Sequence, residues 1–151
     1  MTVEVGQRAP DFELVDQARR PVRLSEYRGK KVVLVFYPFA FSSVCGGELC
    51  VIRDNVGELQ NADVQVLTVS VDSVQVHRAW AQAQGFDYPL LADFWPHGAV
   101  AETYGVFSAE IGAALRGTFI LDREGVVRWK VVNAVPNARD LETYRQVLAD
   151  L

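Results

Sequence analysis

Two thiols are the residues of this chain best suited to chemistry. Cys45 and Cys50 are its only cysteines, and they lie five residues apart in the segment FSSVCGGELC, residues 41–50. Cysteine thiolates are nucleophiles and metal ligands, so the pair indicates redox or metal chemistry. The spacing of apolar residues predicts an amphipathic helix over about 42–59, with its stripe formed by Leu49, Ile52, Val56 and Leu59.

Cys45 falls at the centre of that stripe and in the first turn of the predicted helix. The free N–H groups and partial positive charge of a helix N-terminus favour the thiolate. An unperturbed cysteine, with a pKa of about 8.5, is largely protonated at neutral pH. The same position also suits a small buried apolar residue, and position alone does not separate the two interpretations.

Cys50 is predicted about 140° away from the stripe, on the polar face of the helix. In an intact helix, residues five apart have Cα atoms roughly 8–9 Å apart, whereas a disulfide needs less than about 7 Å. A Cys45–Cys50 bond therefore requires local unwinding. Gly46 and Gly47 each cost a helix roughly 1 kcal/mol relative to alanine, which favours such opening. Alternatively, these glycines allow a neighbouring backbone or a ligand to approach closely.

A zinc site is a competing use of the pair. The only histidines are His77 and His97, and neither they nor the cysteines follow the usual C-x2-C or H-x3-H spacings. The C-x-x-C dithiol that is typical of disulfide exchange is also absent. The sequence therefore predicts no metal, and it argues against a pure thiol-disulfide transfer protein.

Length and charge narrow the remaining classes. The chain has 151 residues, half of them hydrophobic, with a net charge of −4, and no run of Lys or Arg exceeds two. These values predict a single domain, residues 1–151, with no nucleic-acid or anionic-membrane partner. Its longest apolar run, residues 32–41, is too short to span a membrane. The N-terminus lacks the features of a secretion signal, so we expect a soluble, cytoplasmic protein.

The elements that must position the thiols alternate along the chain. A hairpin is predicted from segments 11–16 and 20–24, followed by strands at 32–37, 64–71 and 88–93. Helices are expected at 42–59, 73–84, 98–105 and 139–151, with a second hairpin from strands 117–122 and 126–132. This order predicts an α/β, thioredoxin-like fold with a mixed central sheet flanked by helices and an N-terminal hairpin.

The residues before Cys45 carry a family resemblance. Pro38, Ser42 and Cys45 form the pattern Pro-x-x-x-(Thr/Ser)-x-x-Cys between a buried strand and a helix, which resembles the peroxidatic motif of the peroxiredoxins. The stretches DFWPHGAVAETYGVF (93–107) and RGTFILDREGVVR (116–128) extend the similarity. They most resemble the alkyl hydroperoxide reductase E-type branch. The second cysteine at Cys50 is instead similar to the bacterioferritin comigratory protein branch.

The resemblance implies a role for each motif residue. Cys45 would attack a peroxide oxygen and become a sulfenic acid, while the Ser42 hydroxyl hydrogen-bonds the thiolate and the peroxide. Pro38 would shield the sulfur, and Arg116 would lower the pKa of the thiol and polarise the peroxide. Glu48 matches a frequent motif glutamate. Ordinary structural roles stay open for three of them: helix cap for Ser42, strand end for Pro38 and solvated charge for Glu48.

The resemblance also implies how the enzyme recycles. Cys50 is interpreted as a resolving cysteine that forms a disulfide with Cys45, which a thioredoxin-like dithiol reduces. If Cys50 is only structural, a small thiol or a glutaredoxin-like protein must take the sulfenic acid directly. No cofactor is needed, and a homodimer is implied. A non-catalytic peroxide sensor is a further alternative. Four aromatic side chains are suited to an apolar rim that admits organic hydroperoxides, although such residues more often belong to a core or a dimer interface. They are Phe39, Phe41, Phe94 and Trp95.

Overall fold

A computed structural model describes residues 3–42, 49–50, 52–55, 63–133 and 141–151. Its strands are β1 (Glu13–Val15), β2 (Pro21–Arg23), β3 (Lys31–Phe36), β4 (Val64–Ser70), β5 (Leu90–Ala92), β6 (Phe107–Ser108), β7 (Ala113–Ala114), β8 (Arg116–Leu121) and β9 (Val127–Asn133). Its helices are the 3₁₀ turn η1 (Leu24–Tyr27), α3 (Val74–Gln84), α4 (Ala99–Thr103) and α5 (Leu141–Ala149). Within these ranges, no helix has the length and apolar character needed to cross a membrane.

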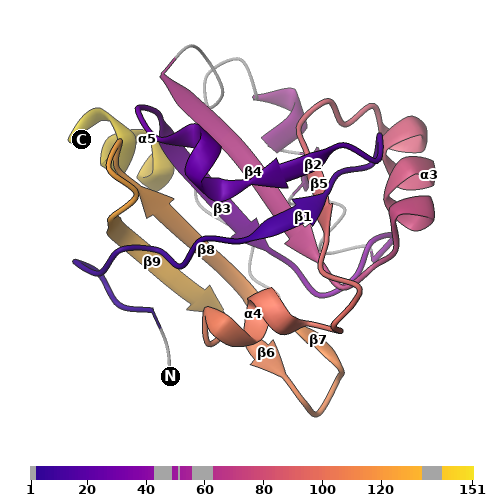
Figure 1. The fold of residues 1–151 in the computed structure, drawn as a ribbon. Coiled ribbons are helices and arrows are strands. Elements are labelled where there is room, and N and C mark those ends of the chain that lie inside the picture. Colours follow the sequence, from indigo (N-terminus) through magenta and orange to yellow (C-terminus); the bar gives the residue numbers. More distant parts are fainter. Residues whose placement is uncertain (1–2, 43–48, 51, 56–62, 134–140) are drawn as a thin grey trace.

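Seven strands form one mixed sheet in the order β2-β1-β5-β4-β3-β8-β9. The central strands β3, β4 and β5 run parallel, whereas β8 and β9 on one side and β1 and β2 on the other join antiparallel. In Figure 1, α3 lies at the right of the sheet, α5 at the left, and α4 beside the small β6–β7 hairpin at the bottom. The α/β, thioredoxin-like architecture predicted from the sequence, with its N-terminal hairpin, is confirmed.

The sheet buries a core on each face, because side chains alternate along its strands. On one face, Phe36 and Phe119 pack against Tyr104, which follows α4. On the other face, hydrophobic residues of β3 and β4 meet α3, α5 and helical residues that follow β3; the largest fully buried ones are Tyr37, Leu49, Ile52, Trp80, Tyr88 and Tyr144. The near-continuous apolar runs of β3 and β4 follow from this double burial.

Most predicted elements are confirmed, with shorter ends. Helix α3 begins after Ser73, whose hydroxyl accepts from the backbone N–H of Val76, and it ends at Gly85 in the left-handed conformation (φ +71°). The sequence pattern did not predict the hairpin of β6 and β7. Of the helix expected over 42–59, the structure describes helical residues at 49–50 and 52–54, and the rest of that prediction lies outside the described residues.

One edge of the sheet gathers segments that are far apart in the sequence. Because β3, β4 and β5 are parallel neighbours, the residues that follow them emerge at the same edge. We call this the carboxyl edge, and it comprises residues 37–42, 70–75 and 93–95. It therefore holds Pro38 and Ser42, the described part of the motif before Cys45.

Candidate active site

The segment from Tyr37 to Ser42, called here the motif loop, leaves the sheet directly after β3. The backbone N–H of Tyr37 still donates to the carbonyl of Val69, at 3.1 Å, so the loop starts in register with β4. Pro38 and Ser42 are half-buried. Cys45 and Glu48, and the glycines between them, lie outside the described residues.

Arg116 opens β8, the antiparallel neighbour of β3. Phe36 pairs with Gly117, and extending this register by one residue sets Arg116 opposite Tyr37, where the motif loop begins. Residues opposite each other in a sheet share a face, so Arg116 lies on the face that also carries Tyr37 and Thr118. This is the face covered by α3 and α5, where the Thr118 hydroxyl contacts that of Tyr144 at 2.9 Å. The half-buried Arg116 therefore begins its strand beside the motif loop.

Cys50 departs from the expectation that it faces solvent. Its side chain is half-buried and packs against the core that α3 and α5 cover. Its Sγ donates to Oε1 of Gln84 at 3.5 Å, and Arg53 donates to the Gln84 backbone carbonyl at 2.5 Å. The end of α3 covers this side of the helical segment, which is why a position on the polar side of the apolar stripe is not fully exposed.

A buried polar cluster adjoins the motif loop. The backbone N–H of Ala40 donates to Oδ2 of Asp72 at 2.7 Å, so the loop after β3 is bonded to the segment after β4. The same carboxylate oxygen accepts the hydroxyl of Ser70 at 2.6 Å. Ser70 is fully buried and 14% of the Asp72 side chain is exposed, so the carboxylate lies at the rim of the buried cluster, next to the proposed motif.

His77, on α3, is the third member of this cluster. Its Nε2 lies 2.7 Å from the Ser70 hydroxyl and 3.3 Å from the Tyr37 hydroxyl, and the ring has no exposed surface. Burial lowers the pKa of His77 to about 4, although the Asp72 carboxylate and the Leu90 carbonyl oppose that shift. The imidazole is therefore neutral at physiological pH.

Sequence reasoning did not assign this cluster to the site. The sequence offers His77 only as a candidate metal ligand, and it indicates no role for Asp72 or Ser70. The usable signal was topological, since polar residues directly after neighbouring parallel strands meet at one edge.

In the part of the chain that the structure describes, no three His, Cys, Asp or Glu residues are grouped so as to hold a metal ion. His97 lies outside this cluster, and its Nε2 contacts the Gly112 carbonyl at 2.7 Å.

The carboxyl edge also exposes large aromatic side chains. Exposed fractions are 41% for Phe39, 58% for Phe41, 53% for Phe94 and 81% for Trp95. Phe94 and Trp95 border a surface hollow of about 550 Å³, whose other walls include Ser73, Val74 and Gln75. The carboxyl edge therefore exposes apolar surface both on the motif loop, at Phe39 and Phe41, and after β5, at Phe94 and Trp95.

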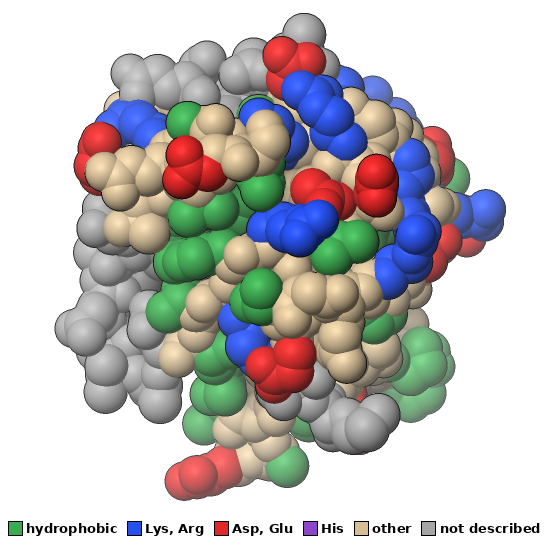
Figure 2. Space-filling view, turned by 90° about the vertical axis from the view of Figure 1, so that its left-hand side faces the viewer, with side chains coloured by type: hydrophobic (Ala, Val, Ile, Leu, Met, Phe, Trp, Pro, Cys, Tyr) green, Lys and Arg blue, Asp and Glu red, His purple; other side chains and the backbone are tan. Residues whose placement is uncertain are grey.

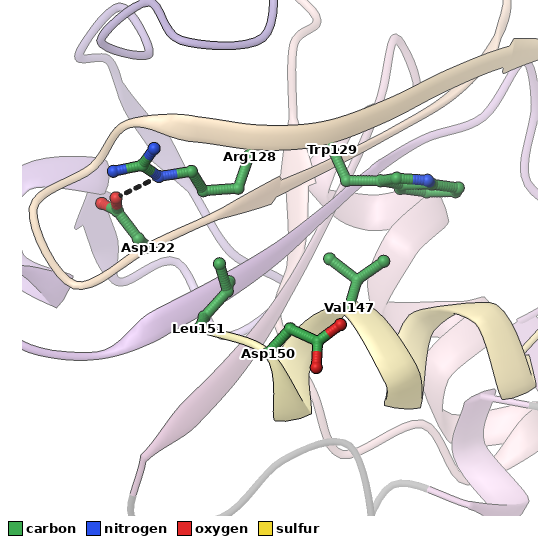
Figure 3. A pocket seen from close by; sticks show the side chains of 6 residues that line it. All are labelled: Asp122, Arg128, Trp129, Val147, Asp150 and Leu151. Atoms are coloured by element: carbon green, nitrogen blue, oxygen red, sulfur yellow. Dashed lines mark hydrogen bonds and ion pairs between the residues drawn. The ribbon is translucent and has the colours of Figure 1, made fainter.

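A second hollow of about 550 Å³ lies at the opposite end of β8, between the β8–β9 hairpin and α5. Figure 3 shows Trp129 and Val147 on its walls and the ion pair from Arg128 Nε to Asp122 Oδ2, at 2.7 Å. On the face drawn in Figure 2, basic and acidic side chains are intermingled rather than gathered into a patch of one sign. Among its described lining residues, this second hollow contains no thiol, hydroxyl or imidazole.

Comparison with known proteins agrees with this geometry. Residues 5–130 match the model of the AhpC/TSA family. The chain is 46% identical to alkyl hydroperoxide reductase E of Mycobacterium tuberculosis over 150 residues, which covers 99% of this chain and 98% of that protein.

Solved structures give the same result. AhpC of Enterococcus faecalis superposes with a TM-score of 0.88 at 33% identity, covering 99% of this chain and 92% of that one. The peroxidoxin BcpB of Mycobacterium tuberculosis has a TM-score of 0.86 at 30% identity, covering 99% and 98%. This chain therefore belongs to the AhpC/TSA family and is a peroxiredoxin, a thiol-dependent peroxidase similar to alkyl hydroperoxide reductase E.

Proposed function

We propose that this peroxiredoxin reduces hydrogen peroxide and organic hydroperoxides through Cys45. The observation that carries the proposal is the meeting of two segments: the motif loop with Pro38 and Ser42 leaves β3 directly opposite Arg116, which opens β8. Cys45 follows three residues after Ser42. Organic hydroperoxides are included because aromatic side chains line the same edge and the most similar relative reported above is named for alkyl hydroperoxides.

The reaction needs an activated thiolate and donors for the leaving oxygen. The Cys45 thiolate attacks the terminal oxygen of ROOH, a sulfur–oxygen bond forms, and the O–O bond breaks. The departing alkoxide takes a proton and leaves as ROH, so sulfur is oxidised by two electrons to the sulfenic acid. The Arg116 guanidinium lowers the pKa of the thiol, and the Ser42 hydroxyl hydrogen-bonds the reacting oxygen. Pro38 keeps water away from the sulfur.

We further propose that Cys50 resolves the sulfenic acid. Its thiolate attacks the Cys45 sulfur, a disulfide forms and water leaves. In the reduced protein Cys50 is a free, half-buried thiol that contacts Gln84, so this step requires its helical segment to detach from the end of α3. A thioredoxin-like dithiol then supplies two electrons to reduce the disulfide.

The wider organisation belongs to the same proposal. We propose a single domain over residues 1–151, a cytoplasmic location, where thiols are kept reduced, and a homodimer. The dimer contact is assigned to the carboxyl edge, because Phe41 and Trp95 there have more than half of their side-chain surface exposed. A second copy covering this surface would also shield the motif loop from water.

Counting thiols after a single turnover tests the two-cysteine cycle. The fully reduced protein and a Cys50→Ser variant each receive one equivalent of hydrogen peroxide, and intact mass and free thiols are measured. We expect wild type to lose both thiols and two mass units, and Cys50→Ser to retain a trappable sulfenic acid. Continued peroxide consumption with thioredoxin and its reductase separates an enzyme from a sensor that oxidises once.

Other outcomes have definite meanings. If wild type accumulates sulfenic acid while Cys50 remains free, the one-cysteine route is correct, with a small thiol or a glutaredoxin-like protein as the resolving partner. If Cys45 is not oxidised by equimolar peroxide, the assignment of the nucleophile is wrong.

A further inference from the structure

The motif loop needs support from outside itself. Phe41, directly before Ser42, adopts φ +66°, a left-handed conformation that is unfavourable for a residue with a side chain. Its ring packs on Trp80 of α3 at a centroid distance of 5.9 Å, but more than half of the side chain is exposed. A conformation of this kind persists only when neighbouring contacts hold it in place.

The Asp72 carboxylate supplies such a contact at the middle of the loop. Ala40 lies halfway between Pro38 and Ser42, and its backbone N–H donates to Oδ2 of Asp72 at 2.7 Å. A hydrogen bond of this length to a charged acceptor is stronger than one between neutral groups. It fixes the loop to the end of β4 rather than to its own strand.

The carboxylate is itself held in position. Ser70 Oγ donates to Asp72 Oδ2 at 2.6 Å and accepts from the Asp72 backbone N–H at 3.3 Å. Because the hydroxyl has a single proton, its 2.7 Å contact with His77 must be donated by Nε2–H of the ring. A chain of donors therefore runs from His77 through Ser70 to Asp72, and all of it is at least mostly buried.

We propose that Asp72 is a positioning residue for peroxide reduction, whose carboxylate, oriented by Ser70 and His77, fixes the backbone of Ala40 and so the placement of Pro38 and Ser42. The proposal rests on the proposed site, since it concerns the loop that carries its motif. The role is geometric, because a negative charge close to the reacting thiol would disfavour the thiolate. Correct placement within an ångström affects rates strongly.

Two substitutions of Asp72 separate geometry from charge. In Asp72→Asn, an amide oxygen at the Oδ2 position can still accept from both Ala40 and Ser70, but the charge is lost. In Asp72→Ala both hydrogen bonds are lost. We expect Asp72→Ala to lower the second-order rate constant for hydrogen peroxide by about 10- to 100-fold, and Asp72→Asn to stay within about 3-fold of wild type. Asp87→Asn, an exposed residue just before β5, is the matched charge control.

Hydrogen exchange at the Ala40 amide provides a readout that a general loss of stability would not mimic. We expect protection of this amide to be lost in Asp72→Ala and kept in Asp72→Asn, while amides in the centre of β8 remain protected in both. If Asp72→Ala does not fold, Ser70→Ala is measured instead. This substitution removes the hydroxyl that orients the Asp72 carboxylate but leaves the carboxylate itself in the protein.

The proposal is overturned if Asp72→Ala reacts with peroxide as wild type does, or if both variants change the rate equally. An equal increase would mean that the charge, not the placement of Ala40, is what matters. A Cys45→Ser variant is measured in parallel. If it still reduces peroxide, the proposed nucleophile fails whatever Asp72 does, so the two failures are distinguishable.

Discussion

The two ends of the central sheet carry hollows of equal size but opposite construction. The carboxyl edge carries one hollow of about 550 Å³, and there the motif loop is held by a mostly buried carboxylate, a serine and a neutral histidine. At the other end, a hollow of about 550 Å³ is bordered by an Asp122–Arg128 pair in which the arginine is half exposed. Cavity size therefore does not distinguish the two ends of the sheet, whereas the fully buried Ser70 and His77 beside the motif loop do.

The two ends differ in whether water can replace the partner that a substitution removes. Water can replace the half-exposed Arg128 guanidinium, so the net contribution of its ion pair is small. Water cannot easily reach the Ser70 hydroxyl, which is fully buried and would be left unsatisfied without the Asp72 carboxylate.

The largest expected difference in activity between the two ends of the sheet comes from substituting one arginine at each end. Arg116→Ala, at the carboxyl edge, should lower kcat/KM for hydrogen peroxide by about 100-fold, because the proposed site then loses the positive charge that stabilises the thiolate and the peroxide. Arg128→Ala, near the other hollow, should stay within about 2-fold and cost less than about 1 kcal/mol of unfolding free energy. Steady-state kinetics and urea unfolding of both variants check this. Comparable losses of activity would remove the distinction between the ends.

Substitutions of Ser42 sharpen the account within the motif loop. Ser42→Ala should slow peroxide reduction by about 10-fold or more, since one hydrogen bond to a charged transition state is lost. Ser42→Thr keeps the hydroxyl and should remain within about 3-fold of wild type. Stopped-flow measurement of thiol oxidation separates these variants. Equal slowing by alanine and threonine would indicate that the volume of residue 42, rather than its hydroxyl, is important.

The buried histidine predicts a pH dependence of stability. The pKa of His77 is about 4 in the folded protein and close to 6.5 when unfolded, so the unfolded state binds more protons as the pH falls below 6.5. The titratable groups that face its ring among the described residues are Asp72 and Tyr37. Lowering the pH from 7.5 to 5 should therefore cost wild type about 2 kcal/mol more unfolding free energy than His77→Gln. Urea unfolding at both pH values measures this, and identical pH dependence would contradict it.

The sequence predicted the fold closely because its strongest patterns concern burial. The unbroken apolar runs of β3 and β4 indicated central strands, and the helix expected over 73–84 is α3. The β6–β7 hairpin was not predicted, since two-residue strands carry too little periodicity to detect. Nor was the half-burial of Cys50 predicted, because that depends on where the end of α3 lies.

The motif residues followed from a resemblance, whereas the cluster behind them depends on topology. Nothing in the spacing of Ser70, Asp72 and His77 indicates a partner 32 residues earlier at Ala40. Their contact exists because β3 and β4 are parallel neighbours, and strand order cannot be read from local periodicity. Polar residues that follow predicted parallel strands therefore deserve testing as one group.

The most direct test of the central claim is the rate of peroxide reduction at Cys45 alone. In a Cys50→Ser variant Cys45 is the only thiol left, so its oxidation by substoichiometric hydrogen peroxide can be followed by stopped flow, with the sulfenic acid trapped and located by mass spectrometry. We predict oxidation about 1,000-fold or more faster than that of free cysteine under the same conditions, with the trap on Cys45. Oxidation at the rate of free cysteine would contradict an activated thiol at the carboxyl edge.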